Sequence, residues 1–431
     1  MMRTYRLLAV LLPLCGGCVV THKVIDPTSE LAEAKVRPGI TILLSDSIQL
    51  IRGKRIGLLT NQTGINERGA SDIDLLREKK ARDASVNLVQ LFSPEHGLRG
   101  TEDRQNIASG IDQKSGLPVY SLYGQQTTAP PDSLLRGLDA LVFDLQDIGT
   151  RTWTYVGAMV YSMRASARLH KPIIVLDRPN PITGYIIEGP VLDASLANPD
   201  DPAPGRPGQA YALWPMPLRH GMTMGEMALY FNDVLKIHAD LHVVPATGWR
   251  RDVWFDLTGL PWVKPSPNMA DVRSAMVYPG LVAFESTNLS VGRGTPEPFQ
   301  RIGAPWLNAA ATLALLKDRE IPGVRFYNES FTPVNASDGK YSGQTIPGLR
   351  IVVVNRSAFQ AARVGATLLW AINKTAGSRL TIENRGFDLR FGSPSLREAL
   401  LRGEDPDVLI DKEYKSAYAF RDATRQYLIY K

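Results

Sequence analysis

The sequence predicts an α/β protein in which a Rossmann-like parallel sheet domain (residues 38–250) is followed by a smaller α/β domain (residues 251–431). In the first part, short apolar segments alternate with segments of helical periodicity. Those short segments are apolar along their whole length, which is typical of parallel strands covered by helices on both faces. From about residue 251 the chain changes to Pro-rich loops and a long polar, Gly-rich segment. A chain of 431 residues fits two or three domains.

The strands expected in the first domain are rich in β-branched and aromatic residues, and the expected helices repeat apolar residues at helical spacing. The helix Met224–Leu235 begins at a capping box formed by Thr223 and Glu226, and the strand Leu241–Pro245 follows it. The other expected strands are Lys54–Thr60, Val86–Phe92, Leu117–Leu122, Ala140–Leu145 and Pro172–Leu176, and the other helices are Asp72–Arg82, Ser133–Leu138 and Tyr155–His170.

The second domain is expected to contain two further helices and two strands. The helix Phe359–Ile372 is strongly amphipathic, and Trp306–Lys317 is the other helix. The strands are Val324–Phe331 and Leu349–Asn355, and short elements with charged helices follow to the end of the chain.

The composition is that of a folded globular protein, with 44% hydrophobic and 21% charged residues. The formal net charge of +6 is spread along the chain. We therefore expect no nucleic-acid partner, because no run of Lys and Arg with interleaved aromatic residues is present.

The first 17 residues have the layout of a lipoprotein signal peptide. Two arginines precede the apolar run Leu7–Leu14, which is too short to span a bilayer in the mature protein. Small residues then lead to Cys18, which we expect to be lipidated, while Cys15 in place of the usual Leu keeps a plain secretory signal as the alternative. Residues 18–37 lack periodicity and are expected to form a tether. We expect a periplasm-facing protein of the bacterial cell envelope, and Val19 in place of Asp favours the outer membrane.

Four polar clusters follow expected strands or lie in Gly- and Pro-rich loops: Asn61–Gly64, Glu95–Arg99, Asp144–Arg151 and Glu285–Arg301. In a parallel sheet the first three share one edge, where ligands bind in open α/β folds. The fourth can face them from the second domain, which predicts an active site in the inter-domain cleft. No Gly-x-Gly-x-x-Gly dinucleotide motif follows the first strand, and no His-Glu-x-x-His zinc motif is present. We therefore expect no bound dinucleotide, no other cofactor and no metal.

Glu95 is the best candidate for a proton-handling group, because it lies in a sharp turn after a buried strand, and a solvated turn with ordinary charges is the alternative. His96 is a candidate for orienting substrate or water, and Asp147 is the third catalytic candidate, with a helix cap as its alternative. Arginines in the clusters are candidates for binding an anionic group, and aromatic residues for stacking on a sugar. The substrate-binding candidates are Asn61, Gln62, Arg99, Asp144, Arg151, Tyr155, Glu285, Asn288, Arg293 and Glu297.

Five motifs in order resemble the NamZ-type exo-β-N-acetylmuramidases, from about residue 38 to the C-terminus. They are Thr60–Gly64, Ser93–Gly97, Phe143–Arg151, Asp177–Pro181 and Glu285–Thr295. The resemblance implies a glycosidase that removes N-acetylmuramic acid from the non-reducing ends of peptidoglycan fragments, in a cleft between a Rossmann-like domain and a smaller one. It also implies that Glu95 is the catalytic glutamate.

Alternatives from other classes remain beside this hypothesis. The polar loops equally fit a non-catalytic lipoprotein that binds muropeptides and is held at the membrane through Cys18. An ester or amide hydrolase that uses Ser93 or His96 is a weaker third hypothesis, because the Gly-x-Ser-x-Gly turn of such enzymes is missing. The sequence leaves open whether a second carboxylate or the 2-acetamido group of the sugar completes the glycosidase mechanism.

Overall fold

A computed structural model describes residues 36–100, 108–123, 129–200 and 210–431 of the chain. The predicted signal peptide, Cys18 and nearly all of the predicted tether therefore lie outside the described residues. The last two residues of that tether belong to the folded part instead. Val36 is buried, and the Arg37 amide donates to the Thr247 carbonyl at 2.9 Å. Within the described ranges, no helix combines the length and the apolar character needed to cross a membrane.

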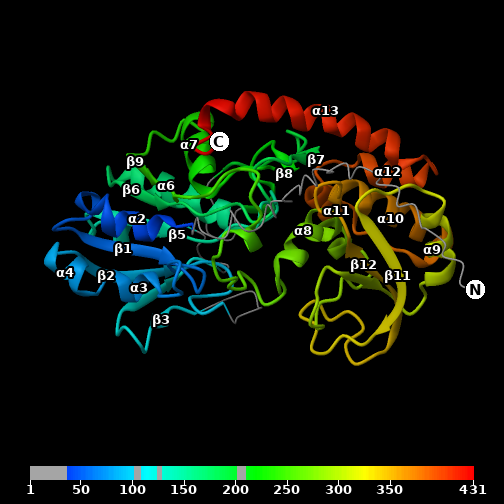
Figure 1. The fold of residues 1–431 in the computed structure, drawn as a ribbon, viewed down its shortest axis with the longest axis horizontal. Coiled ribbons are helices and arrows are strands. Elements are labelled where there is room, and N and C mark those ends of the chain that lie inside the picture. The colour runs from blue at the N-terminus through cyan, green and yellow to red at the C-terminus, as the bar shows by residue number, and fades with distance from the viewer. Residues whose placement is uncertain (1–35, 101–107, 124–128, 201–209) are drawn as a thin grey trace, which may run out of the picture.

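The N-terminal part of the molecule is built on a seven-stranded sheet in the order β3-β4-β2-β1-β5-β6-β9 (Figure 1). All neighbouring strands in it are parallel except β3, which pairs antiparallel with β4 at one edge. This arrangement confirms the predicted fold class. The strands are β1 (Arg55–Thr60), β2 (Asn87–Ser93), β3 (Gly110–Ile111), β4 (Pro118–Ser121), β5 (Ala140–Asp144), β6 (Ile173–Leu176) and β9 (Leu241–Val244).

Helices cover both faces of this sheet, which explains why β5 and β6 are apolar at nearly every position. Along β5, Leu141 and Phe143 enter the core shared with α6 and α7, whereas Ala140 and Val142 enter the core shared with α2 and α3. The helices of this part are α2 (Gly39–Ser45), α3 (Asp72–Leu75), α4 (Lys79–Asp83), α5 (Asp132–Leu135), α6 (Tyr155–Arg168) and α7 (Met224–Val234).

Two details of these helices bear on the sequence predictions. The predicted helix Asp72–Arg82 is two short helices, because Glu78 adopts an extended conformation and a new helix starts after it. The predicted capping box of α7 is confirmed. The Thr223 hydroxyl accepts from the Glu226 amide, and the Glu226 carboxylate accepts from the Thr223 amide at 3.0 Å.

The smaller C-terminal part, which begins at α8, has a three-stranded antiparallel sheet in the order β10-β12-β11. Its strands are β10 (Arg301–Gly303), β11 (Val324–Phe331) and β12 (Ile346–Val353). Its helices are α8 (Val272–Leu281), α9 (Ala309–Lys317), α10 (Ala361–Ala376), α11 (Asn384–Phe391), α12 (Ser395–Leu401) and α13 (Pro406–Thr424). The short 3₁₀ turn η4 (Val282–Ser286) continues α8 directly and becomes part of the site.

The two parts are tied together by the end of the chain. Helix α13 runs from the C-terminal part across the top of the molecule toward α7 (Figure 1). It packs on a two-stranded ribbon of β7 (Glu188–Val191) and β8 (Pro217–Arg219), which the sequence did not predict. The last residues then bind the N-terminal part, where the Tyr430 hydroxyl donates to the buried Asp177 carboxylate at 2.7 Å. The relative placement of the two parts is therefore held by polar contacts as well as by packing.

Candidate active site

A pocket of ≈ 230 Å³ lies between the two parts of the molecule. Its N-terminal wall is formed by Glu95 and His96, which follow β2, and by Thr152–Thr154, which precede α6. The opposite wall carries the charged residues Glu285, Arg293 and Arg390. The other lining residues are Tyr123, Tyr211, Ser266, Asn268, Met269, Tyr278, Val282 and Phe299.

The turn after β2 holds Glu95 at the pocket wall. Pro94 ends the strand, and its carbonyl accepts from the Gly97 amide at 3.0 Å. Between them, His96 has φ = 71°, a left-handed conformation that costs a non-glycine residue about 1–3 kcal/mol. His96 is buried and Glu95 is half-buried. A strained backbone at a pocket wall is typical of functional sites, because the surrounding structure must hold it in place.

Thr154 fixes the Glu95 side chain from the next element. Thr154 stands at the N-cap of α6, but its hydroxyl makes no capping bond to that helix. The hydroxyl instead donates to Oε2 of Glu95 at 2.5 Å. A group that normally stabilises a helix end is thus used to orient a carboxylate in the pocket.

Tyr155 and Asn61 lie behind this wall rather than in the pocket lining. The buried Tyr155 hydroxyl donates to the Pro265 carbonyl at 2.5 Å and accepts from Nδ2 of Asn61 at 2.8 Å. Burial, and next the nearby charge of Glu95, raise the pKa of Tyr155 well above its ordinary value. These contacts join the loop after β1 to the Pro-rich loop that carries Ser266, so both residues support the pocket from outside.

The opposite wall concentrates positive charge around one carboxylate. Oε1 of Glu285 accepts from Nε and Nη2 of Arg293 at 2.8 and 2.5 Å, and Oε2 lies 3.8 Å from Nε of Arg390. The Lys340 ammonium donates to the Glu285 backbone carbonyl at 3.0 Å. Burial lowers the pKa of Lys340 from its ordinary value. Lys340 also lies 4.0 Å from the Asp338 carboxylate. Two guanidinium groups thus approach the single carboxylate of Glu285 at the pocket, which leaves this wall with capacity to bind an anionic group.

Arg390 comes from the last turn of α11. Its guanidinium lies 5.3 Å from the centre of the Tyr211 ring, and its Nη1 donates to the Ser286 hydroxyl at 3.0 Å. Sequence reasoning missed this residue, because it is one arginine among several in a charged segment far from every predicted cluster. Asn268 was missed as well, because nothing in its Pro-rich loop marks one polar side chain for the pocket.

Asp144 and Asp147, predicted as a binding and a catalytic residue, do not line the pocket. The fully buried Asp144 carboxylate pairs with Nε of Arg178 and accepts from its Nη2 at 2.8 Å. Asp147 is buried beside His220, whose Nε2 lies 3.4 Å from Oδ2 of Asp147. The same Oδ2 accepts from the Gly149 amide at 2.6 Å. Both aspartates therefore hold the loop after β5 in place.

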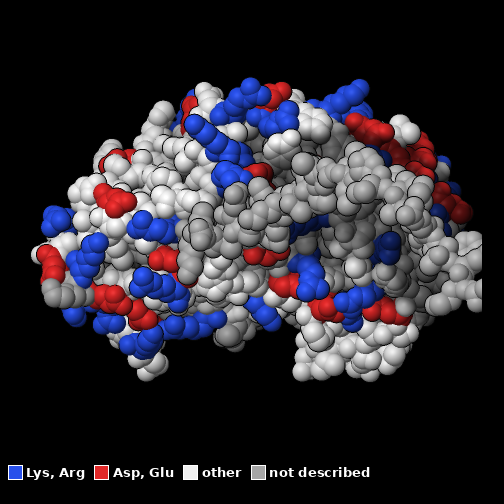
Figure 2. Space-filling model, in the orientation of Figure 1, with Lys and Arg blue, Asp and Glu red and all other residues white. Residues whose placement is uncertain are grey.

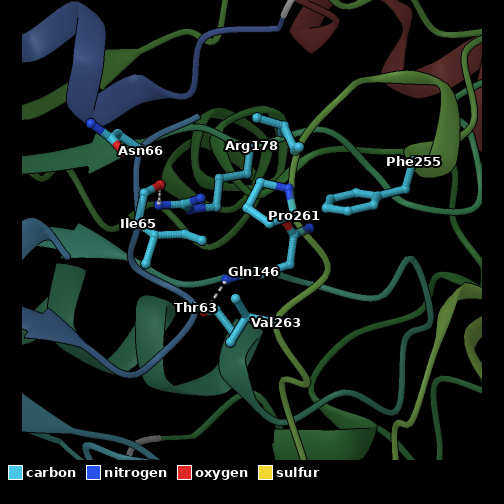
Figure 3. Close-up of a pocket in the computed structure, with 9 residues that line it drawn as sticks. Thr63, Ile65, Asn66, Gln146, Arg178, Phe255, Pro261 and Val263 are labelled. Carbon is cyan, nitrogen blue, oxygen red and sulfur yellow. Dashed lines mark hydrogen bonds between the residues drawn. The ribbon is translucent and has the colours of Figure 1, made fainter. Parts of the chain in front are cut away.

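A second, much smaller pocket next to Arg178 is shown in Figure 3. Its volume is ≈ 10 Å³, about that of one water molecule. Its polar groups bond to each other: Arg178 donates to the Ile65 carbonyl at 2.8 Å, and the Gln146 amide donates to the Thr63 hydroxyl at 3.0 Å. This pocket is too small and too well satisfied to accept a sugar.

The remaining predicted binding residues have partners outside the pocket. Gln62 donates to the Lys264 carbonyl at 2.7 Å, and the exposed Arg99 pairs with Asp112. Asn288 binds the backbone of residues 379 and 381, and Glu297 pairs with Arg301 and Arg350. Arg151 is buried and donates only to backbone carbonyls in the part of the chain that the structure describes. Of the predicted residues, the pocket brings together Glu95, His96, Glu285 and Arg293.

The described ranges contain no group of three or more His, Cys, Asp or Glu side chains arranged to hold a metal ion. On the face of the molecule shown in Figure 2, acidic and basic side chains are interspersed rather than gathered into one large basic patch.

Comparisons with known proteins converge on one family. Residues 56–273 match the family model described as the N-terminal part of exo-beta-N-acetylmuramidase NamZ, and residues 276–430 match its C-terminal part. The chain is 39% identical to the peptidoglycan beta-N-acetylmuramidase NamZ of Bacillus subtilis (strain 168) over 92% of either chain. Crystal structures of two DUF1343 family proteins from Bacteroides fragilis are similar. One has a TM-score of 0.82 at 32% identity and covers 92% of this chain and 100% of its own. The other has a TM-score of 0.70 at 27% identity and covers 92% of this chain and 99% of its own.

Proposed function

This chain belongs to the NamZ family of exo-β-N-acetylmuramidases, and on that basis we propose that it is a glycoside hydrolase releasing N-acetylmuramic acid from the non-reducing ends of peptidoglycan fragments. The observation that carries the proposal is the pocket between the two parts of the molecule, in which Glu95 and Glu285 stand on opposite walls. Glycoside hydrolysis generally needs an acid that protonates the departing oxygen and a second group that acts on the sugar.

We propose Glu95 as the general acid/base. Its carboxyl group reaches the pocket from a turn with a strained backbone, and the Thr154 hydroxyl donates to it at 2.5 Å, which orients it. A proton given by Glu95 to the glycosidic oxygen releases the rest of the fragment. In a retaining scheme Glu95 then takes a proton from the water that completes hydrolysis, whereas in an inverting scheme Glu285 takes that proton. His96, adjacent on the same wall, is placed to orient the substrate or that water.

Glu285 and the 2-acetamido group of the sugar are the two candidates for the second group. Attack on the sugar by either one gives a product that retains its anomeric configuration, whereas activation of a water by Glu285 inverts it. The configuration of freshly released N-acetylmuramic acid, followed by proton NMR, separates inversion from retention.

Arg293 and Arg390 are proposed to recognise the lactyl carboxylate, the group that distinguishes N-acetylmuramic acid from N-acetylglucosamine. Both guanidinium groups face Glu285 on the positively charged wall, at 2.5 Å and 3.8 Å from its oxygens. Guanidinium groups bind carboxylates through paired, charge-assisted hydrogen bonds. The same wall would therefore both bind the sugar's acid and hold Glu285.

The test is hydrolysis of a chromogenic β-glycoside of N-acetylmuramic acid by the Glu95→Gln variant. We expect kcat to fall by about 10²–10⁴-fold, the usual contribution of general acid/base catalysis. Glu67→Gln is the matched control, because Glu67 also lies in a loop after a strand of the same sheet but binds only the Thr41 hydroxyl among the contacts described. Normal turnover by Glu95→Gln would remove Glu95 from the mechanism, and absence of product with the unmodified protein would reject the proposed activity.

We also propose that a lipid on Cys18 anchors the enzyme in the cell envelope, facing the periplasm, with the outer membrane as its location. The support is the signal-peptide layout of the sequence. Cells fed an alkyne-labelled fatty acid should label the chain, the Cys18→Ser variant should lose the label, and the Cys15→Ser variant should keep it. Label on the Cys18→Ser variant, or recovery of the unmodified chain in the soluble fraction, would contradict the anchor.

A further inference from the structure

Arg151 has an unusual environment for a charged side chain. It follows β5 in the N-terminal part, its exposed fraction is 3%, and none of the ion pairs among the described residues includes it. Its guanidinium donates to three backbone carbonyls instead, from Nη1 to Tyr211 at 2.8 Å and to Leu389 at 3.2 Å, and from Nη2 to Arg390 at 2.9 Å. Two of these acceptors belong to residues whose side chains line the pocket.

Burying a guanidinium without an acidic partner is costly unless its N–H groups are hydrogen-bonded, and here the three backbone carbonyls supply those acceptors. Burial lowers the pKa of Arg151 to about 9, which still leaves the group charged at neutral pH. Part of the cost is offset at the end of α11, where the last carbonyls of a helix lack intrahelical donors and carry partial negative charge. Arg151 supplies these donors from the other part of the molecule.

The three carbonyls connect Arg151 to the positively charged wall of the pocket. Fixing the backbone of Tyr211 and Arg390 together sets their side chains relative to each other, with the guanidinium of Arg390 at 5.3 Å from the Tyr211 ring. The same guanidinium lies 3.8 Å from Glu285. Because Arg151 belongs to the N-terminal part and Arg390 to the C-terminal part, this contact also joins the charged wall to the part of the molecule that carries Glu95.

We propose that Arg151 is a positioning residue: it holds Arg390 and Tyr211 in place and thereby sets the selectivity of the pocket for the carboxylate of the substrate. The inference rests on the proposed function, since it takes Arg390 as part of the carboxylate site. Arg151 itself touches no substrate. A lysine at this position keeps the charge but has no planar fork, so it cannot bridge carbonyls on both segments at once.

The test compares two substrates, the chromogenic glycoside of N-acetylmuramic acid and the same glycoside with its lactyl carboxylate converted to an amide. For Arg151→Lys we expect KM of the carboxylate substrate to rise about 10-fold, because small displacements of binding groups have effects of this size or more. The KM of the amide substrate and kcat on both substrates should change less than about 2-fold. In an Arg390→Met background, the effect of Arg151→Lys on the carboxylate substrate should largely disappear, because the group that it positions is gone.

Arg251→Lys is the matched control. Arg251 is also a largely buried arginine that donates to backbone carbonyls, those of Gly184 and Gly221, and it lies away from this pocket. Unlike Arg151 it also pairs with an acidic residue, Glu226, at 2.5 Å. Arg251→Lys should lower the thermal midpoint of unfolding by an amount similar to that of Arg151→Lys. It should leave unchanged the ratio between the KM of the carboxylate substrate and the KM of the amide substrate. An equal loss on both substrates in Arg151→Lys, or full additivity with Arg390→Met, would overturn the positioning role.

A crystal structure of Arg151→Lys separates failure of this inference from failure of the proposed function. We expect the Arg390 guanidinium to leave the Tyr211 ring, and an unchanged position would reject the inference whatever the kinetics show. If Arg390→Met leaves the preference for the carboxylate substrate intact, then Arg390 does not bind the substrate carboxylate and that part of the proposed function fails. The crystal structure of Arg151→Lys then tests by itself whether Arg151 positions Arg390. Arg151→Gln, whose amide still donates to one carbonyl, replaces the lysine variant in each measurement if that variant does not fold.

Discussion

The Asp144→Asn variant tests whether Asp144 supports the fold or binds substrate. In the structure its carboxylate is fully buried and forms a two-bond ion pair with Arg178, whose side chain is 4% exposed. The substitution keeps the shape of the side chain but leaves the Arg178 charge buried without its partner. Breaking a buried pair in this way costs about 3–5 kcal/mol in the free energy of unfolding.

A second carboxyl group nearby reduces that cost. Oδ1 of the buried Asp72 lies 3.9 Å from Nη2 of Arg178. Burial, and next the negative charge of Asp144, raise the pKa of Asp72 well above its ordinary value. Removing the charge of Asp144 removes one of these causes, so Asp72 is free to ionise and pair with Arg178. We therefore expect a net loss of about 2–4 kcal/mol in Asp144→Asn, and a larger loss when Asp72→Asn is added.

The measurement is urea unfolding followed by circular dichroism, together with kinetics on the chromogenic substrate at a temperature where the variant is folded. Asp132→Asn is the control, because it breaks an exposed ion pair with Arg168 at 3.1 Å, which should change stability by less than about 1 kcal/mol. We expect kcat/KM of Asp144→Asn to stay within about 3-fold of the unmodified protein, since the pair lies outside the pocket. A large rise in KM with unchanged unfolding would refute this reasoning and return Asp144 to the substrate site.

Three further predictions follow from single contacts. Thr154→Val should lower kcat by about 2–10-fold and Thr154→Ser should restore it, because the hydrogen bond that orients the Glu95 carboxyl group contributes about 0.5–1.5 kcal/mol. Equal kinetics for the two variants would contradict this. Gly365→Ala should cost about 1–3 kcal/mol in urea unfolding, because a Cβ there lies 1.9 Å from a carbonyl of α8, whereas Gly137→Ala, with open space around it, should cost little. Burial raises the pKa of Asp177 from 3.8 to about 6, so the stability that this group contributes is complete below pH 3.8 and is lost as the pH rises through 6. In Asp177→Asn, the change in the free energy of unfolding between pH 3.8 and pH 6 should be smaller by about 3 kcal/mol. An unchanged dependence of the unfolding free energy on pH would contradict this prediction.

The large sheet could be predicted because its buried strands carry their signal locally. Strands β5 and β6 are apolar at nearly every position, as burial on both faces demands. The short strands β3 and β8 have two or three residues, including Gly110 and Pro217, and no local pattern marks them. Their pairing is decided by the neighbours that the fold brings to them, which a reading of the sequence one segment at a time does not contain.

On the wall that follows β2, the prediction of Glu95 and His96 rested on a strand end, because a parallel sheet fixes where the residues after its strands lie. On the opposite wall, Glu285 and Arg293 were predicted from the polar, Gly-rich character of their segment. Arg390 could not be predicted, because its place depends on how α11 packs against the N-terminal part through the carbonyls that Arg151 binds. When residues from the N-terminal and C-terminal parts meet in one site, they share no fixed spacing along the sequence that a motif search could detect.

Polar residues that follow buried strands can either stabilise their own loop or face a ligand, and there is a physical reason why their position alone does not separate the two roles. The backbone leaving such a strand has donors and acceptors that must be satisfied, and short polar side chains do this locally. Asn61 accepts from the Thr63 amide at 2.9 Å and Asp147 from the Gly149 amide at 2.6 Å, so both are occupied by their own loops. Glu95 differs because its described hydrogen-bond donor, Thr154, comes from another segment that also lines the pocket. A carboxylate or amide whose hydrogen-bond donor lies in its own loop therefore stabilises that loop. A carboxylate whose donor comes from another segment of the pocket is held toward a ligand instead.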